Sequence, residues 1–307
     1  MPCFHPLKGW RSKKTNPSGK RGIVFKEDLG IISQPMEVPC GQCVGCRLER
    51  SRQWAMRCVH EASQHDRNTF ITLTYAPDHL PEDGSLKLEH FQKFMKRFRD
   101  YKSRKVDSKK VKFYHCGEYG ELNGRPHYHA LIFGYQFPDL VHWKTRNGIP
   151  YFNSDILSKL WPFGFNTVGE VTFESAAYCA RYILKKVNGD AAESHYANID
   201  KETGEYIGQK KPEYTTMSKG VGKSWFEQYK DEVYPHDQVI MRGKRMKPPK
   251  YYDSILEQEH EEMFNRIKEE RKARSIENRK DNTPSRLHDK ETVCEARTSF
   301  LKRGLEQ

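Results

Sequence analysis

Two histidines one residue apart, His127 and His129, are the first residues in the sequence whose types and spacing indicate chemistry. The apolar stretch that begins at Pro126 predicts a β-strand, since proline is tolerated at the first position of a strand. Side chains alternate across a strand, so both histidines point to one face and Tyr128 to the other. Two imidazoles on one face are half of a site for a divalent metal ion.

Glu118 is expected to complete this site. Residues 112–118 predict a preceding strand, and residues 119–125 include Gly120, Asn123 and Gly124, which favour a turn. A hairpin closed at this turn brings Glu118 beside the two histidines. The three side chains would then hold one divalent cation and leave positions open for water or phosphate. A His-x-His pair alone is a weak sign, because histidine pairs also occur at surfaces and in cores.

A second group of reactive residues lies on a helix expected to begin at residues 174–175. At about 100° per residue, Tyr178, Tyr182 and Lys185 form one stripe of this helix. An apolar stripe lies roughly 150° away by the same arithmetic and comprises Ala177, Ala180, Leu184 and Val187. This pattern predicts that the tyrosines face away from the main packing surface. The alternative is that both are core aromatics.

Four cysteines near the N-terminus predict a structural zinc site. Cys40, Cys43 and Cys46 follow the spacing Cys-x-x-Cys-x-x-Cys, and Cys3 is the candidate fourth ligand. The start of the chain lacks the apolar core of a secretory signal, which favours reduced thiols or a metal site over disulfides. Uncoordinated thiols and an iron–sulfur cluster remain as alternatives.

The expected elements form an α+β fold. A Thr-rich strand spans residues 68–75, and an amphipathic helix carries Leu88, Phe91, Phe94, Met95 and Phe98. With the hairpin, a short helix capped by residues 153–155, the next strand near 165–173 and the tyrosine helix, the order is strand–helix–strand–strand–helix–strand–helix. This order predicts an antiparallel sheet with helices on one face.

Three motifs follow one another along the chain: the stretch Phe-Ile-Thr-Leu-Thr-Tyr at 70–75, His-Tyr-His at 127–129, and the helix with two tyrosines and a lysine. Together they resemble the HUH endonucleases, the nicking enzymes of rolling-circle replication and conjugation. The paired tyrosines and the Cys-rich stretch are most similar to the replication initiators of gokushovirus-type microviruses. The resemblance covers most of residues 1–250.

This resemblance implies an antiparallel sheet related to the RNA-recognition fold, with the active site on the sheet. It implies that Tyr178 and Tyr182 nick single-stranded origin DNA by transesterification, which leaves a 5′-phosphotyrosine adduct and a 3′-hydroxyl primer, and that rejoining releases circles. Glu118, His127 and His129 would hold Mg²⁺ or Mn²⁺, and Lys185 would neutralise the developing charge. A host polymerase and helicase are the expected partners, in the host bacterial cytoplasm.

A formal charge of +12 also favours a polyanionic partner. The side chains expected to contact DNA are Arg47, Arg50, Arg57, Arg125, Arg181 and Lys186. For the arginines of the helix expected at 48–65, the alternative is a solvated helix face.

We predict four segments. Residues 1–66 form a Cys-rich leader with a zinc knuckle and a basic helix, 67–188 the nicking core, 189–252 a β-rich extension, and 253–307 a charged helix and flexible tail. In the leader, only one strand is expected, at 22–25. Gly222-Lys223-Ser224 imitates the end of a P-loop, but Met217 replaces its first glycine, so no nucleotide cofactor is expected. No apolar run long enough for a membrane span occurs.

Two other functions remain open. The same chemistry would serve a plasmid initiator, a relaxase or a transposase, although the cysteine cluster and paired tyrosines favour the microviral proteins. A protein of a different class, a zinc-stabilised DNA-binding protein without catalysis, is disfavoured by the intact set of tyrosines, histidines and lysine. Formation of a covalent DNA adduct would distinguish these functions.

Overall fold

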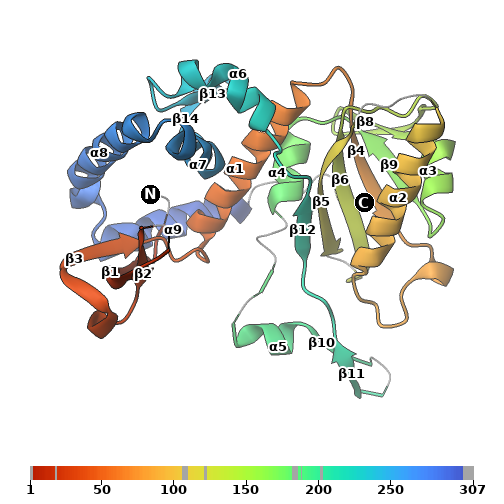
Figure 1. The fold of residues 1–307 in the computed structure, drawn as a ribbon. Helices are drawn as coiled ribbons and strands as arrows, with labels where there is room; N and C mark the ends of the chain where they lie inside the picture. The colour runs from red at the N-terminus through yellow and green to blue at the C-terminus, as the bar shows by residue number, and fades with distance from the viewer. Residues whose placement is uncertain are drawn as a thin grey trace. The chain divides into compact units, whose positions relative to one another are not determined.

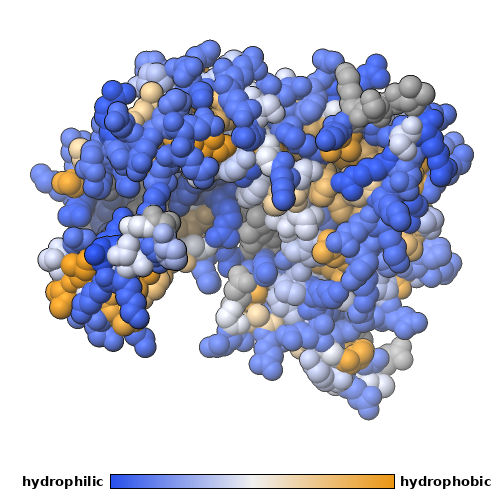
Figure 2. Space-filling view, in the orientation of Figure 1, coloured by the Kyte–Doolittle hydropathy of each residue, from blue (hydrophilic) through white to orange (hydrophobic). Residues whose placement is uncertain are grey.

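The computed structural model describes residues 3–17, 19–105, 110–120, 123–181, 186–187, 189–200 and 203–299. The described chain divides into two compact units. One contains residues 3–50 and 269–299, and the other contains residues 51–268. The surface visible in Figure 2 is mainly hydrophilic, in keeping with a sequence in which 31% of the residues are charged.

The larger unit is built on a seven-stranded sheet in which every neighbouring pair is antiparallel (Figure 1). In spatial order its strands are β12 (Tyr214–Met217), β5 (Lys112–Tyr119), β6 (Pro126–Phe133), β4 (Asn68–Thr74), β9 (Asn166–Gly169), β8 (Ile149–Asn153) and β7 (Val141–Arg146). The predicted α+β class with an antiparallel sheet is confirmed. The order places β4, the first motif strand, at the centre, directly beside the histidine strand β6.

Helices cover both faces of this sheet, whereas the sequence placed them on one. On one face lie α2 (Leu88–Arg104) and α3 (Asp155–Leu160), and on the opposite face lie α1 (Val44–Ala62) and α4 (Phe173–Arg181). The central strand explains the difference. Ile71 is buried in the core under α2, and its neighbour Phe70 is buried in the core under α1 and α4. A strand that is apolar on both sides needs cover on both sides.

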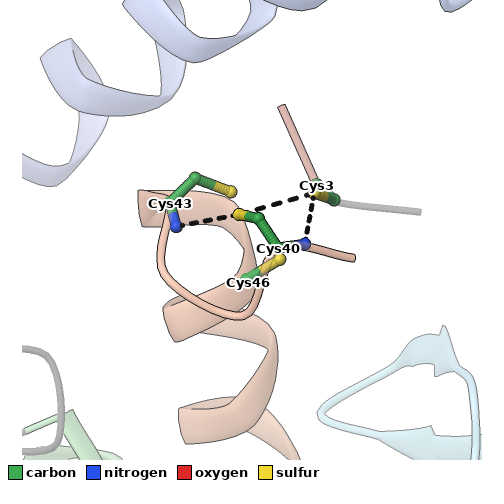
Figure 3. Close-up of side chains that lie close together, drawn as sticks. All are labelled: Cys3, Cys40, Cys43 and Cys46. Atoms are coloured by element: carbon green, nitrogen blue, oxygen red, sulfur yellow. Dashed lines mark hydrogen bonds between the residues drawn. The ribbon is translucent and has the colours of Figure 1, made fainter. Parts of the chain in front are cut away.

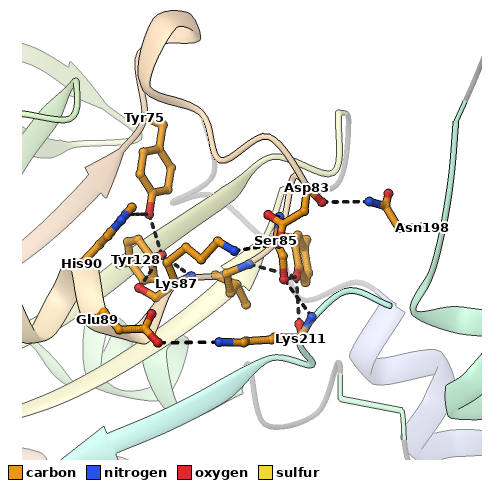
Figure 4. Close-up of polar contacts among 11 residues, drawn as sticks. Tyr75, Asp83, Ser85, Lys87, Glu89, His90, Tyr128, Asn198 and Lys211 are labelled. Atoms are coloured by element: carbon orange, nitrogen blue, oxygen red, sulfur yellow. Dashed lines mark hydrogen bonds and ion pairs between the residues drawn. The ribbon is translucent and has the colours of Figure 1, made fainter. Parts of the chain in front are cut away.

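Tyr128 points to the face opposite the histidines, as predicted, and joins a hydrogen-bonded group (Figure 4). Its hydroxyl lies 2.8 Å from that of Tyr75, which lies 2.7 Å from Nδ1 of His90. The Tyr128 hydroxyl also donates to the carbonyl of Lys87 and accepts from its N–H. These bonds fix the loop before α2, which includes η2 (Pro77–His79), against the middle of β6.

The predicted β-rich extension contains helices as well as strands. In order it comprises α5 (Ala191–His195), β10 (Ala197–Ile199), β11 (Tyr206–Gln209), β12, α6 (Lys223–Val233), β13 (Val239–Met241) and β14 (Lys244–Met246). The pair β10–β11 is attached to the loop before α2, because Asn198 donates to the carbonyl of Asp83 and the N–H of Lys211 donates to Ser85 (Figure 4). Helix α6 packs with α7 (Lys250–Glu259) and the first part of α8 (Glu261–Glu277) in a separate core.

The P-loop-like stretch opens α6, and its backbone is used within the protein. The N–H of Gly222 donates to Oε2 of Glu61 at 2.8 Å, and Nζ of Lys112 lies 2.9 Å from the same oxygen. A buried carboxylate of the chain therefore occupies the position at the helix N-terminus that a phosphate would take in a nucleotide site.

The smaller unit holds a three-stranded antiparallel sheet of β1 (Leu7–Thr15), β2 (Arg21–Val24) and β3 (Gly30–Val38), in the order β2-β1-β3, with η1 (Glu27–Leu29) before β3. The prediction of a single strand here was wrong. The strands carry few apolar residues, so their alternation is weak in the sequence. Trp10 on β1 is buried, and Gly30 lies so close to it that any side chain at position 30 would overlap the indole.

The region expected to be a flexible tail contains η4 (Asn278–Asp281) and α9 (Pro284–Ser299). The N–H of Arg286 donates to the hydroxyl of Thr283, and Pro284 takes the first helical position, where it needs no donor. Leu287 is buried, and Glu291 pairs with His5 at 2.6 Å. The signal missed in the sequence was this cap followed by proline. No helix among the described residues is long and apolar enough to cross a membrane.

Candidate active site

The β5–β6 hairpin brings Glu118 to the histidines, as predicted from the sequence. Glu118 is the direct partner of His127 in the antiparallel register, and Cys116 is the partner of His129. On the other side of β6, strand β4 places Thr72 opposite His129. Three adjacent strands therefore contribute side chains to one point on the sheet.

The two histidines converge on one carboxylate oxygen of Glu118, the third predicted ligand. Nε2 of His127 and Nε2 of His129 lie 2.8 and 2.9 Å from the same Oε1 of Glu118. All three side chains are buried, and their candidate ligand atoms lie within 4.8 Å of one another. This grouping has the size and composition of a site for a divalent cation.

The Nδ1 atoms of both histidines are held by neighbouring groups. Nδ1 of His127 lies 3.2 Å from the carbonyl oxygen of Arg125, which can only accept, so Nδ1 carries the proton. Where Nε2 of His127 carries no proton, its lone pair faces the carboxylate oxygen of Glu118, and a cation bound to both atoms would satisfy them. Nδ1 of His129 is held 2.9 Å from the hydroxyl of Thr72, an outer contact of the type that orients metal-binding histidines.

Glu118 is ionised at neutral pH. Burial raises the pKa of its carboxyl, but the hydrogen bonds from His127 and His129 outweigh burial and bring that pKa to about 2. The site therefore contains a buried negative charge, which suits a metal ion.

Two other metal-capable histidines lie elsewhere. His115 stacks on Phe91 with ring centroids 3.4 Å apart, and its Nδ1 contacts Thr216. His65 pairs with Glu61 at 2.8 Å. Neither belongs to the group around Glu118.

Tyr178 lies beside the candidate metal ligands. Helix α4 begins with a reciprocal cap in which Thr172 and Ser175 each accept from the other's N–H. One turn further, the Tyr178 ring stands perpendicular to that of His129 at a centroid distance of 5.0 Å. It is only 3% exposed, so it does not face away from the packing surface as expected. The reason is that α4 lies on the histidine face of the sheet. Tyr182 and Lys185 lie outside the described residues.

These groups open onto one cavity of about 960 Å³. Its lining includes His127, His129 and Tyr178, together with Thr72 from the central strand. Sequence reasoning missed a further part of the lining that comes from β7, β8 and the start of β9, including Trp143, Lys144, Tyr151 and Asn166. No motif marks these residues, because they reach the site only through the order of the strands.

The cations expected to contact DNA occupy different environments. Arg125 lines the cavity and donates to the carbonyl of Tyr75. Arg57 is sandwiched between Trp54 and Tyr251, 4.0 and 3.8 Å from their ring centroids, which gives it a packing role. Arg50 is exposed, and Arg47, Arg181 and Lys186 are half-buried. Contacts of these six residues with DNA stay predictions.

The four N-terminal cysteines form a second cluster, in the smaller unit (Figure 3). Their sulfur atoms lie within 4.8 Å of one another, and those of Cys3 and Cys40 are 3.8 Å apart. Four thiolates around zinc at about 2.3 Å give a tetrahedron with edges of about 3.8 Å. The observed separation fits such a site and is far longer than a disulfide bond.

Backbone N–H groups point at these sulfur atoms, as expected around metal-bound thiolates. The N–H of Cys40 donates to Cys3, and that of Phe4 donates to Cys43. Burial raises the pKa of Cys40, but N–H groups of Cys43 and Gln42 outweigh it and lower that pKa to about 7. The turn requires Gly41, whose φ is +77°.

Comparison with known proteins agrees with this arrangement. Residues 68–187 match the family described as replication-associated protein ORF2/G2P. The chain is 34% identical over 290 residues to replication-associated protein ORF2 of Spiroplasma virus 4, covering 88% of this chain and 86% of that protein. It is 31% identical over 271 residues to replication-associated protein VP4 of Bdellovibrio phage phiMH2K, covering 86% and 80%.

A third relative is replication-associated protein ORF4 of Chlamydia phage 1, at 33% identity over 229 residues, covering 71% of this chain and 53% of that protein. No solved structure shows significant similarity. The match extends over most of this chain and of its first two relatives, and the family model covers the strands that carry Glu118, His127 and His129. The chain therefore belongs to the replication-associated proteins of microviruses of the gokushovirus type.

Proposed function

We propose that this protein initiates rolling-circle replication by nicking single-stranded origin DNA with a tyrosine. The observation that carries the proposal is the convergence of His127 and His129 on one carboxylate oxygen of Glu118, with Tyr178 against His129 in the same cavity. Relatives named as replication-associated proteins support the role in replication.

The reaction is a transesterification at a backbone phosphate. The phenolate oxygen forms a bond to phosphorus while the bond to the 3′-oxygen breaks, and that oxygen takes up a proton to become a free 3′-hydroxyl. Bound by Glu118, His127 and His129, Mg²⁺ or Mn²⁺ would polarise the phosphate and stabilise the leaving oxygen. Arg125 is positioned in the cavity to bind the charged backbone.

Release of a circle would require a second cut while the first 5′-end is still held, and a second tyrosine would make that cut. Tyr182 lies four residues after Tyr178 in the sequence, a spacing that puts both hydroxyls on one side of a continuous helix. One tyrosine would keep the first 5′-end while the other cuts the regenerated origin, so that the freed 3′-hydroxyl closes a circle. Lys185 would neutralise charge at the phosphate. A host polymerase would extend the 3′-hydroxyl, with a host helicase, in the bacterial cytoplasm.

We further propose that Cys3, Cys40, Cys43 and Cys46 bind a structural zinc ion. The sulfur separation and the N–H groups that point at the sulfur atoms support this assignment. The ion would be separate from the catalytic metal, since the two clusters belong to different compact units.

A covalent-adduct assay tests the nicking function. The protein is incubated with single-stranded DNA of the viral origin region, labelled on the 3′ side of the cut, and Mn²⁺. We expect a labelled band at the size of the protein under denaturing conditions. Tyr178→Phe and Tyr182→Phe should each leave some adduct but stop complete rounds of circle release, and the double variant should form none. Tyr206→Phe, at an exposed position, is the matched control.

Mass spectrometry of the trapped peptide identifies the tyrosine that carries the nucleotide. Adduct found on only one of the two tyrosines would refute alternation. DNA binding without any adduct in the presence of Mn²⁺ would instead identify the protein as a non-catalytic DNA-binding protein.

A further inference from the structure

The cavity extends from the metal ligands across the sheet to the β7–β8 hairpin. The strand registers put His129, Thr72 and Thr167 side by side on β6, β4 and β9. Further along the same face, Tyr151 on β8 is paired with Lys144 on β7. At about 4.8 Å per strand, the distance from β6 to β7 is roughly 19 Å, longer than one phosphate group requires. This end of the cavity has no part in the proposed cleavage chemistry.

A β-bulge places an aromatic ring at the far end of the cavity. The register between β7 and β8 shifts between His142 and Lys144, so Trp143 is an extra residue on β7. In a regular strand Trp143 and Lys144 would point to opposite faces, yet both line the cavity. Trp143 is 50% exposed, and Nζ of Lys144 lies 4.0 Å from the centre of its ring. The bulge thus presents a large aromatic side chain with a cation beside it.

Two polar atoms in this wall have no hydrogen-bond partner among the described residues. They are the hydroxyl oxygen of Tyr151, which is 6% exposed, and Oδ1 of Asn166. The Asn166 amide is oriented by its Nδ2, which donates to Ser158 at 3.0 Å. Burial raises the pKa of Tyr151, so its hydroxyl is a donor at neutral pH. An unsatisfied donor and an acceptor beside an aromatic ring indicate a ligand that is flat and polar at its edge.

The charges of the lining favour an anionic ligand. Among the described residues that line the cavity, Arg125, Lys144 and Arg146 are cations and Asp155 is the one carboxylate, while the buried carboxylate of Glu118 lies beside His127 and His129 at the other end. A flat group with a polar edge, joined to a negative charge, is the chemical description of a nucleotide. Aromatic rings beside cations are the usual means of binding single-stranded nucleic acid.

We propose that the bulged β7–β8 hairpin binds a nucleotide of the single strand next to the cut site. Its base stacks on Trp143, its phosphates lie near Lys144 and Arg146, and Tyr151 and Asn166 face the base edge. This proposal rests on the proposed nicking function. It adds the surface that binds the single-stranded DNA and fixes its position relative to the cut site.

The test compares two probes with the same phosphates. One is a fluorescein-labelled 12-nucleotide oligodeoxythymidylate, and the other is a 12-mer of abasic residues. Binding to the full-length protein is measured by anisotropy without added Mg²⁺ or Mn²⁺. Trp143→Ala should weaken binding of the thymidylate probe by about tenfold, the scale of one base–aromatic stack, and leave the abasic probe unchanged. Trp143→Phe should restore most of the loss.

Lys144→Ala should weaken both probes, and Tyr151→Phe only the thymidylate probe. Tyr206→Ala, an exposed aromatic residue of β11, should change neither. If Trp143→Ala weakens both probes equally, or neither, the stacking proposal is overturned. Because no Mg²⁺ or Mn²⁺ is added and no cleavage is needed, the outcome of this assay is independent of the adduct assay. Adduct formation with no difference between the probes refutes the stacking surface alone.

Discussion

At the scale of single residues, the site around Glu118 combines a carboxylate whose pKa is about 2 with two histidines held through their Nδ1 atoms. We expect Glu118→Gln to lower metal-dependent cleavage by about 100-fold or more, because the amide keeps the shape but removes the charge that binds the cation. Affinity for single-stranded DNA should change little, since phosphate contacts elsewhere supply it. Gel assays of cleavage and anisotropy of binding, over a range of Mn²⁺ concentrations, measure the two effects.

His127→Ala and His129→Ala should behave in the same way, while His236→Ala, at an exposed position, should match the wild type. Cleavage that continues at full rate in EDTA would contradict the metal assignment.

A different histidine makes stability depend on pH. His60 is stacked on Trp225 at a centroid distance of 3.4 Å, with its Nδ1 2.9 Å from the Tyr252 hydroxyl. Burial lowers the pKa of His60 to about 3, against about 6.5 when the chain is unfolded. Above pH 6.5 the ring is neutral in both states. As the pH falls from 6.5 toward 3, only the unfolded chain takes up the proton, so stability is lost.

We therefore expect the free energy of unfolding to be about 2–3 kcal/mol lower at pH 4.5 than at pH 7.5 through this group. Urea titrations at several pH values measure the slope. His60→Phe keeps an aromatic ring and should flatten the slope, whereas His236→Ala should leave it unchanged. An equal slope in His60→Phe would mean that other groups cause the loss.

Local rules predicted the grouping of Glu118 with the two histidines because the information is local. The alternation of His127 and His129 and the short turn after Glu118 involve neighbouring residues only. The contact of Thr72 with His129 and the burial of Tyr178 depend on how distant strands and helices pack together. No spacing of residues in the sequence indicates this packing. Trp143 was missed for the same reason, since a bulge turns it toward a site built from other strands.

At the scale of elements, the strands and helices with strong periodicity were predicted and those with weak periodicity were not. The amphipathic pattern of α2 and the apolar run of β4 mark these elements clearly. The polar strands β1 and β3 have little alternation, and α9 is recognisable mainly from its cap at Thr283 and Pro284. The placement of helices on both faces of the sheet follows from β4, which is apolar on both sides. The apolar neighbours Phe70 and Ile71 in the sequence already indicate this placement.

One glycine controls how β4 ends. The N–H of Thr74 donates to Phe165 and that of Ala76 to Phe163, both at 2.8 Å, so the segment around Gly164 pairs closely with the end of β4. A Cβ at position 164 would overlap the backbone N of Ala76. We expect Gly164→Ala to lower the free energy of unfolding by about 1–3 kcal/mol or more. Urea denaturation measures this, with Gly22→Ala as a control where a Cβ meets nothing.

Because Gly164 lines the cavity, the same substitution should also lower the rate of cleavage. This loss of rate should be seen even at a temperature where the variant protein remains folded. A Gly164→Ala protein with wild-type stability would show that the backbone adjusts at no cost.

At the scale of the whole molecule, the proposed zinc ion would cross-link the segments of the smaller unit. Cys3 precedes β1 and Cys40 follows β3, while Cys43 and Cys46 lie at the start of α1. One ion bound to all four would therefore join both ends of the three-stranded sheet to a helix. A small sheet with few buried apolar residues gains much of its stability from such a cross-link, because metal binding contributes directly to folding.

We expect one zinc ion per chain in freshly purified, reduced protein, measured by elemental analysis. Cys43→Ser should lose the ion, while Cys294→Ser, in the same unit but outside the cluster, should keep it. Glu118→Gln should also keep the zinc ion, since the proposed catalytic metal would be bound at a different cluster. Removal of zinc should expose residues 3–50 to limited proteolysis before residues 51–268, because the larger unit has its own cores. Absence of zinc from the wild-type protein, or equal protease resistance of both units after chelation, would contradict a structural role for the ion.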